Sequence, residues 1–231
     1  MLLLNYMNKL KLFFENQPYN YLFLVLFFVI ANYLSNWPGV FSGQFLGLST
    51  AFWFWLTLIT PVVHQLFVWF AWRSELHYGL LSKWFGMRAF DIYAAIFTIL
   101  ILGRGLFIVC LGISNLGSWQ TGWAWRYIVS FVLLLPIIYT MYSVNKYFTF
   151  RRAFGIDHFD PSFRNKPLVD QGIYRYTNNA MYTFAALSVW LPALLFASKA
   201  ALISAVFNYG AVWVHYFTTE KPDMKHIYGD K

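Results

Sequence analysis

The sequence has little charge and almost no cysteine. Only 11% of its 231 residues are Asp, Glu, Lys or Arg, whereas 59% are hydrophobic. Soluble domains carry about 25% charged residues, so too few polar side chains remain to cover a globule in water, and a soluble domain is excluded. Cys110 is the single cysteine, which excludes an internal disulfide and a cysteine-rich metal site. Its apolar neighbours predict a small buried residue.

Long apolar runs are abundant instead. A helix needs about 20 apolar residues to cross a bilayer, and the sequence predicts an all-α, polytopic transmembrane bundle of about six spans. The predicted spans are Tyr21–Trp37, Phe45–Trp72, Ile92–Ile113, Tyr127–Phe148, Met181–Ser198 and Ala200–Phe217. Only Lys199 and its neighbours separate the last two runs, so we predict a C-terminal helical hairpin with a tight turn.

Basic residues lie on alternate connections between these runs. They precede the first span and follow the second, fourth and sixth, whereas the opposite connections carry almost none. The positive-inside rule then places both termini in the cytoplasm. This topology and contact with anionic lipid explain the formal charge of +8, which therefore does not indicate nucleic acid. Residues 1–14 lack the pattern of a cleaved signal peptide and predict an amphipathic helix on the cytoplasmic face.

The longest polar stretch, residues 151–179, precedes the hairpin, and a polar tail follows it. A helical hairpin brings its two ends together, so we expect these polar segments to be neighbours on the cytoplasmic side. A site built there would combine water-borne and lipid-borne reactants. Trp69 and Trp72 lie at the same predicted membrane edge, where tryptophans usually serve as interface anchors.

Two segments carry the residues suited to chemistry. Residues 172–183, Gly-Ile-Tyr-Arg-Tyr-Thr-Asn-Asn-Ala-Met-Tyr-Thr, place an arginine, two asparagines and three tyrosines at the start of an apolar helix. The asparagines either cap the helix or hold a polar ligand against the positive end of its dipole. Glu220, at the end of the last span, is either solvated, paired with an arginine, or bound to a cationic ligand.

Together these segments resemble the signature of the membrane methyltransferases related to isoprenylcysteine carboxyl methyltransferase and phospholipid N-methyltransferases. The first is similar to their Gly-x-Tyr-Arg-Tyr-x-Arg-His-Pro-x-Tyr motif. Residues 220–229 are similar, with the same spacing, to their Glu-Glu-Pro-x-Leu-x-x-x-Phe-Gly tail, and the resemblance covers about residues 166–229. Asn178-Asn179-Ala180 replaces Arg-His-Pro, and Lys221 replaces the second glutamate. The asparagines look more like the phosphatidylethanolamine methyltransferase branch.

The resemblance implies S-adenosylmethionine as the methyl donor and no metal. It implies Glu220, Asn179 and Tyr182 as catalytic residues. The residues expected to bind the donor are Gly172, Tyr174, Arg175, Tyr176, Asn178, Asn179, Tyr182, His215 and Glu220. A carboxylate suits the donor's ammonium or ribose, an arginine suits its carboxylate, and a tyrosine ring suits its sulfonium.

The expected acceptor is a membrane lipid, with the amine of a phosphatidylethanolamine-type headgroup as the methylated group. Arg104, Arg151 and Arg152 are the candidates to hold its phosphate. Arg104 lies in mid-span, where an arginine costs at least about 2.5 kcal/mol unless it faces a partner or cavity. It either pairs internally, with Asp91 or a carbonyl, or binds lipid.

This interpretation divides the chain into N-terminal transmembrane helices that form an acceptor cavity, residues 1–150, and a methyltransferase-like region with the cofactor pocket, residues 151–231. Asp157 and His158 are candidate proton acceptors, and we expect His64 to belong to a polar patch within the bundle.

Three alternative functions stay open. One is a carboxyl or thiol methyltransferase acting on a lipophilic, isoprenylated substrate. Another is a sterol-reductase-like enzyme that uses NADPH, because that family has a similar Arg-Tyr and Asn/His-Pro-x-Tyr pattern. The third is a small transporter, which requires ionisable groups along a path through the membrane. Only Arg104 and His64 qualify for such a path.

Overall fold

The computed structural model describes residues 2–164, 166–167 and 169–229, and it is the all-α bundle that the sequence predicts. The α-helices are α1 (Leu2–Phe13), α2 (Gln17–Leu34), α3 (Thr50–Tyr78), α4 (Leu80–Phe85), α5 (Ala89–Ser114), α6 (Trp123–Ser143), α7 (Phe150–Ala153), α8 (Pro161–Arg164), α9 (Ala180–Thr183), α10 (Leu191–Leu195), α11 (Lys199–His215) and α12 (Lys221–Tyr228). Tighter 3₁₀ turns are η1 (Gly86–Arg88), η3 (Ile156–His158), η4 (Gly172–Arg175) and η5 (Ala185–Trp190), and wider π turns are η2 (Val144–Phe148) and η6 (Tyr216–Glu220).

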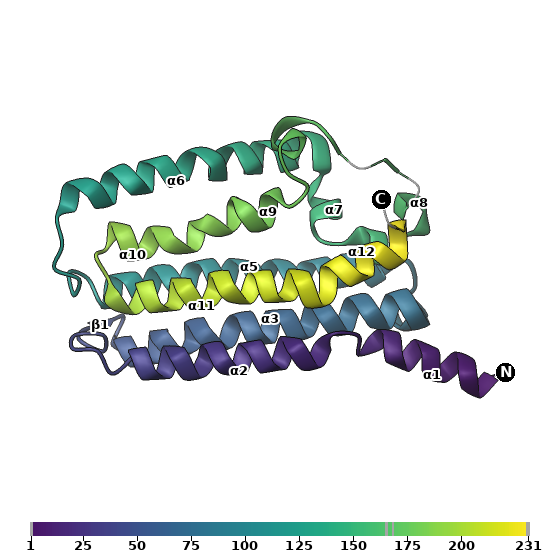
Figure 1. Cartoon of the computed structure of the whole chain (residues 1–231), viewed down its shortest axis with the longest axis horizontal. Helices are drawn as coiled ribbons and strands as arrows, with labels where there is room; N and C mark the ends of the chain where they lie inside the picture. Colours follow the sequence, from purple (N-terminus) through teal and green to yellow (C-terminus); the bar gives the residue numbers. More distant parts are fainter. Residues whose placement is uncertain (1, 165, 168, 230–231) are drawn as a thin grey trace.

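The long helices run side by side in one bundle (Figure 1). Helices α2 and α3 form one edge, α5 and α11 pack beside them, and the α9–α10 segment lies between this group and α6 at the other edge. Helices α1, α7, α8 and α12 gather at one end of the bundle together with the basic connections, and we call this the basic end. Two short antiparallel strands, β1 (Gln44–Phe45) and β2 (Leu48–Ser49), lie at the opposite end and were not predicted.

Five helical stretches of the described chain are long and apolar enough to cross a membrane, rather than the six expected. They are Tyr6–Leu34, Thr50–Tyr78, Leu80–Ser114, Trp123–Phe148 and Lys199–Tyr228. The expected span at 181–198 is instead a shorter apolar helix, Ala180–Leu195. Pro192 lacks the N–H that would bond the Ser188 carbonyl, and the residues before it form the tight η5 turn rather than a regular α-helix.

The predicted C-terminal hairpin is present, and one buried asparagine holds its turn together. Asn115 accepts hydrogen bonds through Oδ1 from the Ala200 N–H (3.0 Å) and the Ser198 hydroxyl (3.1 Å). The Ser198 hydroxyl in turn caps α11 by accepting from the Ala201 N–H at 3.0 Å. The end of α5 thereby fixes the angle at which α11 starts.

Small residues let α11 pack in the centre of the bundle. Ala200, Ala201, Ala205 and Ala211 are fully buried, and a side chain at Gly210 would collide with the Phe27 ring. Close backbone approach lets neighbouring helices bury α11 on several sides. The outer helices instead expose large apolar side chains along their length, as a lipid-facing surface requires.

Candidate active site

The two polar segments singled out in the sequence meet at the basic end of the bundle. Tyr182, in α9, donates its phenolic hydrogen to the Glu220 carboxylate at the end of η6. Among the described residues, Tyr182 is the hydrogen-bond partner of the Glu220 side chain. The other lone pairs of the Glu220 carboxylate are therefore open to a ligand. The expected convergence of the hairpin's two ends is therefore present.

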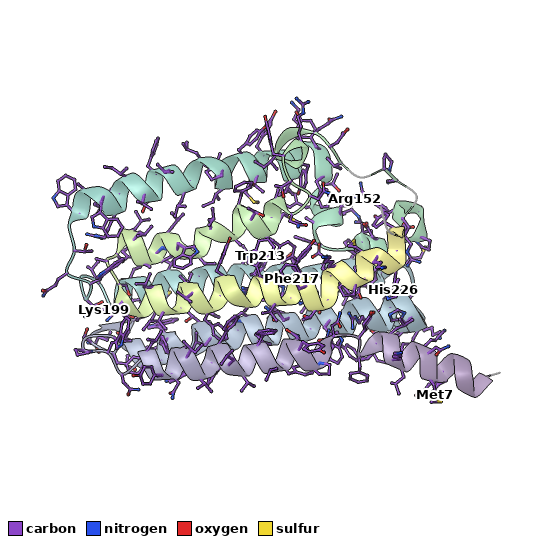
Figure 2. All side chains as sticks on the ribbon, in the orientation of Figure 1. Met7, Arg152, Lys199, Trp213, Phe217 and His226 are labelled. Atoms are coloured by element: carbon purple, nitrogen blue, oxygen red, sulfur yellow. The ribbon has the colours of Figure 1, made fainter. Side chains whose placement is uncertain are left out.

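Aromatic rings from the last helix hold Tyr182 in place. Its ring centroid lies 4.9 Å from that of Tyr216 and 6.0 Å from that of Trp213. Phe217 extends this group, with its ring 5.8 Å from Trp213. Figure 2 shows Trp213 and Phe217 on this helix, well away from Lys199 at its opposite end. Through Tyr182, Glu220 is thus joined to a cluster of aromatic rings, and carboxylates and ring faces both attract cations.

A proline explains why the helix changes direction just after Glu220. Pro222 has no N–H, so the Thr218 carbonyl lacks the partner that an α-helix would supply. Arg73 fills this gap from α3 at 3.1 Å, and Gln17 fills it from α2 at 3.3 Å. The π turn η6 (Tyr216–Glu220) and the start of α12 are thereby tied to two other helices.

A buried ion pair strengthens the same attachment. Arg73 and Asp223 bond at 2.9 Å with side chains 0% and 1% exposed. Arg73 also donates to the Phe13 carbonyl at 3.0 Å. His158 lies 3.4 Å from the second Asp223 oxygen and stacks on Trp72 at 4.2 Å. These contacts hold α12, and with it Glu220, against α3.

A large apolar cavity of about 830 Å³ opens beside the Tyr182–Glu220 pair. Its walls come from α3, α5, the end of α6, the α9–α10 segment and α11. The polar residues lining it are His64, Gln65, Thr98, Arg104, Tyr182, Ser188, Asn208, His215 and Glu220. The cavity therefore joins a carboxylate at the basic end to an apolar interior deep in the bundle.

Arg104 lies deep in this cavity. Its guanidinium bonds His64 Nδ1 at 3.1 Å and donates to Asn208 Oδ1 at 3.2 Å. The expected pairing with Asp91 is absent, because Asp91 lies at the start of α5 and bonds Arg151 at 3.2 Å. Within the described part of the chain, no carboxylate forms an ion pair with Arg104.

Of the other residues expected to bind the donor, His215 lines the cavity, whereas Gly172 and Tyr174 do not. Gly172 has a φ of 62°, and a Cβ on it would lie 2.5 Å from Ser143 Oγ. The glycine thus allows close contact with the end of α6. Tyr174 is buried with its ring stacked on Phe148 at 4.9 Å. Burial, and to a lesser degree Glu220, raise the pKa of the Tyr174 phenol, so it stays neutral at physiological pH.

The remaining residues of the segment do not line the cavity. Arg175 and Asn178 are exposed, and Tyr176 is 75% exposed. Asn179 is half-buried, and its side chain interacts with the Tyr216 phenol beside Tyr182. The structure thus brings Asn179, Tyr182, His215 and Glu220 to one region, whereas Tyr176 faces away from it.

The two arginines at the start of the polar stretch, Arg151 and Arg152, lie at the basic end and do not line the cavity. Arg151 is largely exposed with Asp91. Arg152 donates to the Pro167 carbonyl at 3.1 Å and the Tyr228 hydroxyl at 3.3 Å. Figure 2 shows Arg152 and His226 at this end of the molecule.

Both candidate proton acceptors of the loop are engaged elsewhere. Asp157 accepts from the Tyr228 hydroxyl, and His158 is stacked on Trp72 beside Asp223. Trp72, expected as an interface anchor, is only 4% exposed because its ring is covered by His158.

Sequence reasoning missed Asn208 and Arg73. Asn208 stands in an apolar run, and a polar residue in mid-span is itself a signal of a functional or structural site. Arg73 was interpreted only as a topology signal at the edge of a span. Its burial depends on a partner 150 positions away, Asp223, and no local pattern reveals such a pairing.

Comparison with known families identifies the C-terminal part of the chain. Residues 125–231 match the phospholipid methyltransferase family. The matched segment contains Tyr182, His215 and Glu220, and the match supports lipid-related methyl transfer as the general activity. Together with the apolar helices it makes the chain an integral membrane protein. No curated protein and no solved structure matches the chain significantly.

Phospholipid methyltransferases normally use S-adenosylmethionine, and the residues present fit that group. Its positive charges need a carboxylate or ring faces, and Glu220 and Tyr182 offer both. Its polar atoms need hydrogen-bond partners, and His215 Nδ1, in the cavity wall, is buried without a partner among the described residues.

Proposed function

We propose that the chain transfers a methyl group from S-adenosylmethionine to the amine of a phosphatidylethanolamine-type phospholipid. The observation that supports this most directly is the Tyr182–Glu220 pair at the basic end of a cavity of about 830 Å³. A carboxylate is suited to a cationic donor or a lipid amine, and an apolar cavity is suited to an acyl chain.

Each residue has a distinct part in this proposal. Glu220 binds positive charge of the donor, and Tyr182 orients the carboxylate through its hydroxyl. Asn179 steadies Tyr216, whose ring supports Tyr182. His215 offers an unpartnered nitrogen to the bound reactant. When bound, the donor supplies an electrophilic methyl group, and the protein contributes alignment and exclusion of water.

The membrane arrangement of the proposal follows the distribution of charge. The basic end faces the cytoplasm, so the water-soluble donor arrives there, and the lipid arrives laterally between helices. Residues 1–150 contribute the acceptor cavity, and residues 151–231 contribute the donor-binding region. Arg175 and Asn178 are exposed at this end, and contact with the donor would require the segment to move.

Labelled donor tests the proposal. Purified protein in lipid nanodiscs is incubated with methyl-labelled S-adenosylmethionine and mixed phospholipids, and the lipids are then separated. We expect label in methylated phosphatidylethanolamine, a loss of about 100-fold in Glu220→Gln, and a severe loss in Asn179→Ala. Asp160→Asn, a carboxylate-to-amide change at a residue that does not line the cavity, is the matched control.

The same experiment separates the alternatives. Full activity in both Glu220→Gln and Asn179→Ala would refute the site. If label appears on an added isoprenylated carboxylate or thiol, but not on phospholipid, the chain would be a carboxyl or thiol methyltransferase instead. Retention of NADPH without retention of the methyl donor would favour a reductase.

A further inference from the structure

Arg104 presents a positive charge to an apolar cavity, and none of the described carboxylates forms an ion pair with it. A guanidinium has five N–H donors. Among the described residues, the hydrogen-bond partners of the Arg104 guanidinium are His64 and Asn208, and both are neutral acceptors. Because the guanidinium only donates, His64 Nδ1 must accept, which leaves the hydrogen on Nε2. An arginine in this position is costly unless a partner or water compensates it. The cavity therefore favours an anion at this point.

The neighbouring residues hold the guanidinium rigidly and leave space beside it. Asn208 is fixed by donating to the Thr57 carbonyl at 3.1 Å and the Ser204 carbonyl at 3.0 Å. Gly105, which follows Arg104, also lines the cavity, and a Cβ on it would meet nothing within 4 Å. The Arg104 guanidinium is thus held in a fixed orientation with open space beside it, as in a preorganised binding site.

Other polar atoms of the same wall have no partner within the described residues. They are His64 Nε2, Gln65 Oε1 and His215 Nδ1. His64 and His215 are only 6% and 7% exposed, and all three residues line the cavity. Buried polar atoms normally have partners, so these atoms are a second indication that a polar ligand occupies this part of the cavity.

The cavity carries opposite charges at two levels. Asn208, which marks the level of Arg104, precedes Glu220 by twelve residues on one helical stretch, so their backbones lie about 18 Å apart along it. Arg104 and Glu220 do not form an ion pair with each other. The two charged sites are therefore separate positions in the cavity, and an oxyanion at Arg104 need not belong to the same group that meets Glu220. The carboxylate of the methyl donor and the phosphate of a lipid headgroup are both oxyanions suited to Arg104.

We infer that Arg104, held by His64 and Asn208, is the binding site for an oxyanion of a reactant inside the cavity, as the partner of the cation site at Glu220. The inference rests on the proposed function for the identity of that reactant. Arg104 and His64 lie outside the segment that matches the phospholipid methyltransferase family, residues 125–231, so the N-terminal helices supply the cation of this subsite and one of its two partners. Arg151 and Arg152, which lie outside the cavity, do not compete for it.

Two binding measurements on the full chain test this site without requiring turnover. The first is the Kd for S-adenosylhomocysteine, which keeps the donor's carboxylate. The second is thermal stabilisation by phosphatidylethanolamine, compared with a long-chain amine that lacks phosphate. Both are made on the wild type, Arg104→Gln and the control Arg151→Gln, which removes the same charge from the surface.

We expect Arg104→Gln to weaken one of the two ligands by about 10- to 100-fold, the usual range for losing a hydrogen bond to a charged group. Weaker S-adenosylhomocysteine binding identifies the donor's carboxylate. Weaker phosphatidylethanolamine binding, with the phosphate-free amine unaffected, identifies the lipid phosphate. If both ligands bind folded Arg104→Gln as tightly as they bind Arg151→Gln, the inference is overturned.

A second variant covers poor folding of Arg104→Gln. Arg104→Lys keeps the charge and loses the planar fork of donors. We expect it to lower the affinity for the same ligand by about 3- to 10-fold. Unchanged binding of both ligands in Arg104→Lys, where Arg104→Gln does not fold, would also overturn the inference. A wild type that binds these ligands through Arg104 yet transfers no methyl group would leave the oxyanion site standing and remove the proposed function.

Discussion

At the scale of single residues, the three tyrosines of the segment 172–183 have three different environments. The Tyr174 ring is buried and stacked on Phe148, and Tyr176 is exposed. Tyr182 donates its hydroxyl hydrogen to the Glu220 carboxylate. Their spacing alone does not separate these roles, because the segment is an irregular series of turns rather than one helix. Only Tyr182 is in a position to affect the carboxylate directly.

Removing the hydroxyl of Tyr182 tests this difference. We expect Tyr182→Phe to lower kcat/KM for methyl transfer by about 10- to 100-fold, because a hydrogen bond to a charged group contributes about 1.5–3 kcal/mol. Tyr176→Phe should leave kcat/KM unchanged, since Tyr176 is exposed. Equal effects of the two substitutions would contradict the assignment of Tyr182.

Gly172 offers a second test at this scale. Alanine at a positive φ costs about 1–2 kcal/mol, and the contact with Ser143 adds about 1–3 kcal/mol. Gly79 has a similar φ of 60° but open space around it. Gly172→Ala should therefore lower the thermal unfolding midpoint clearly more than Gly79→Ala does. A similar decrease in both would indicate that the contact at Gly172 relaxes freely.

At the scale of elements, the sequence predicted the regular parts of the fold and missed the irregular ones. Long apolar runs and the position of Lys199 were enough for the spans and the hairpin. The broken helix Ala180–Leu195 was counted as a full span, because hydropathy does not register the bond that Pro192 removes. The meeting of Tyr182 with Glu220 was predicted, since both lie next to the hairpin ends. The Arg73–Asp223 attachment was not predictable, because it depends on the packing of α12 against α3.

The attachment of α12 has a large expected effect on stability. Asp223→Ala leaves Arg73 buried without its partner, and removing one member of a buried pair costs about 3–5 kcal/mol. Asp91→Ala removes an exposed ion pair of the same type and should cost about 0–1 kcal/mol. Thermal unfolding in detergent compares the two. A small effect of Asp223→Ala would mean that Gln17 and the backbone hold α12 without the ion pair.

At the scale of the whole molecule, composition and apolar runs led to the membrane assignment, which the domain match supports. The orientation in the membrane and the division at residue 150 stay predictions. The cavity could be expected only in outline, since its polar wall combines Arg104, His64 and Asn208 from three helices. Each of these residues alone has an ordinary structural explanation.

Cysteine labelling tests the predicted orientation. In a Cys110→Ala background, a cysteine is placed either at Met87, 100% exposed at the basic end, or at Leu116, 67% exposed at the opposite end. We expect a membrane-impermeant thiol reagent added to intact cells to label Leu116→Cys and spare Met87→Cys. The reverse pattern would place the basic end outside the cell and the donor site away from the cytoplasm.

The bond from Gln17 to Thr218 joins residues 201 positions apart. The amide that holds the last helix is therefore synthesised near the beginning of the chain, whereas the carbonyl it holds emerges near the end. During biosynthesis the place where Glu220 is held cannot be completed until the helix that carries Thr218 has been inserted. A nascent or truncated chain that still lacks its last helix would have bilayer-spanning segments but no finished catalytic centre.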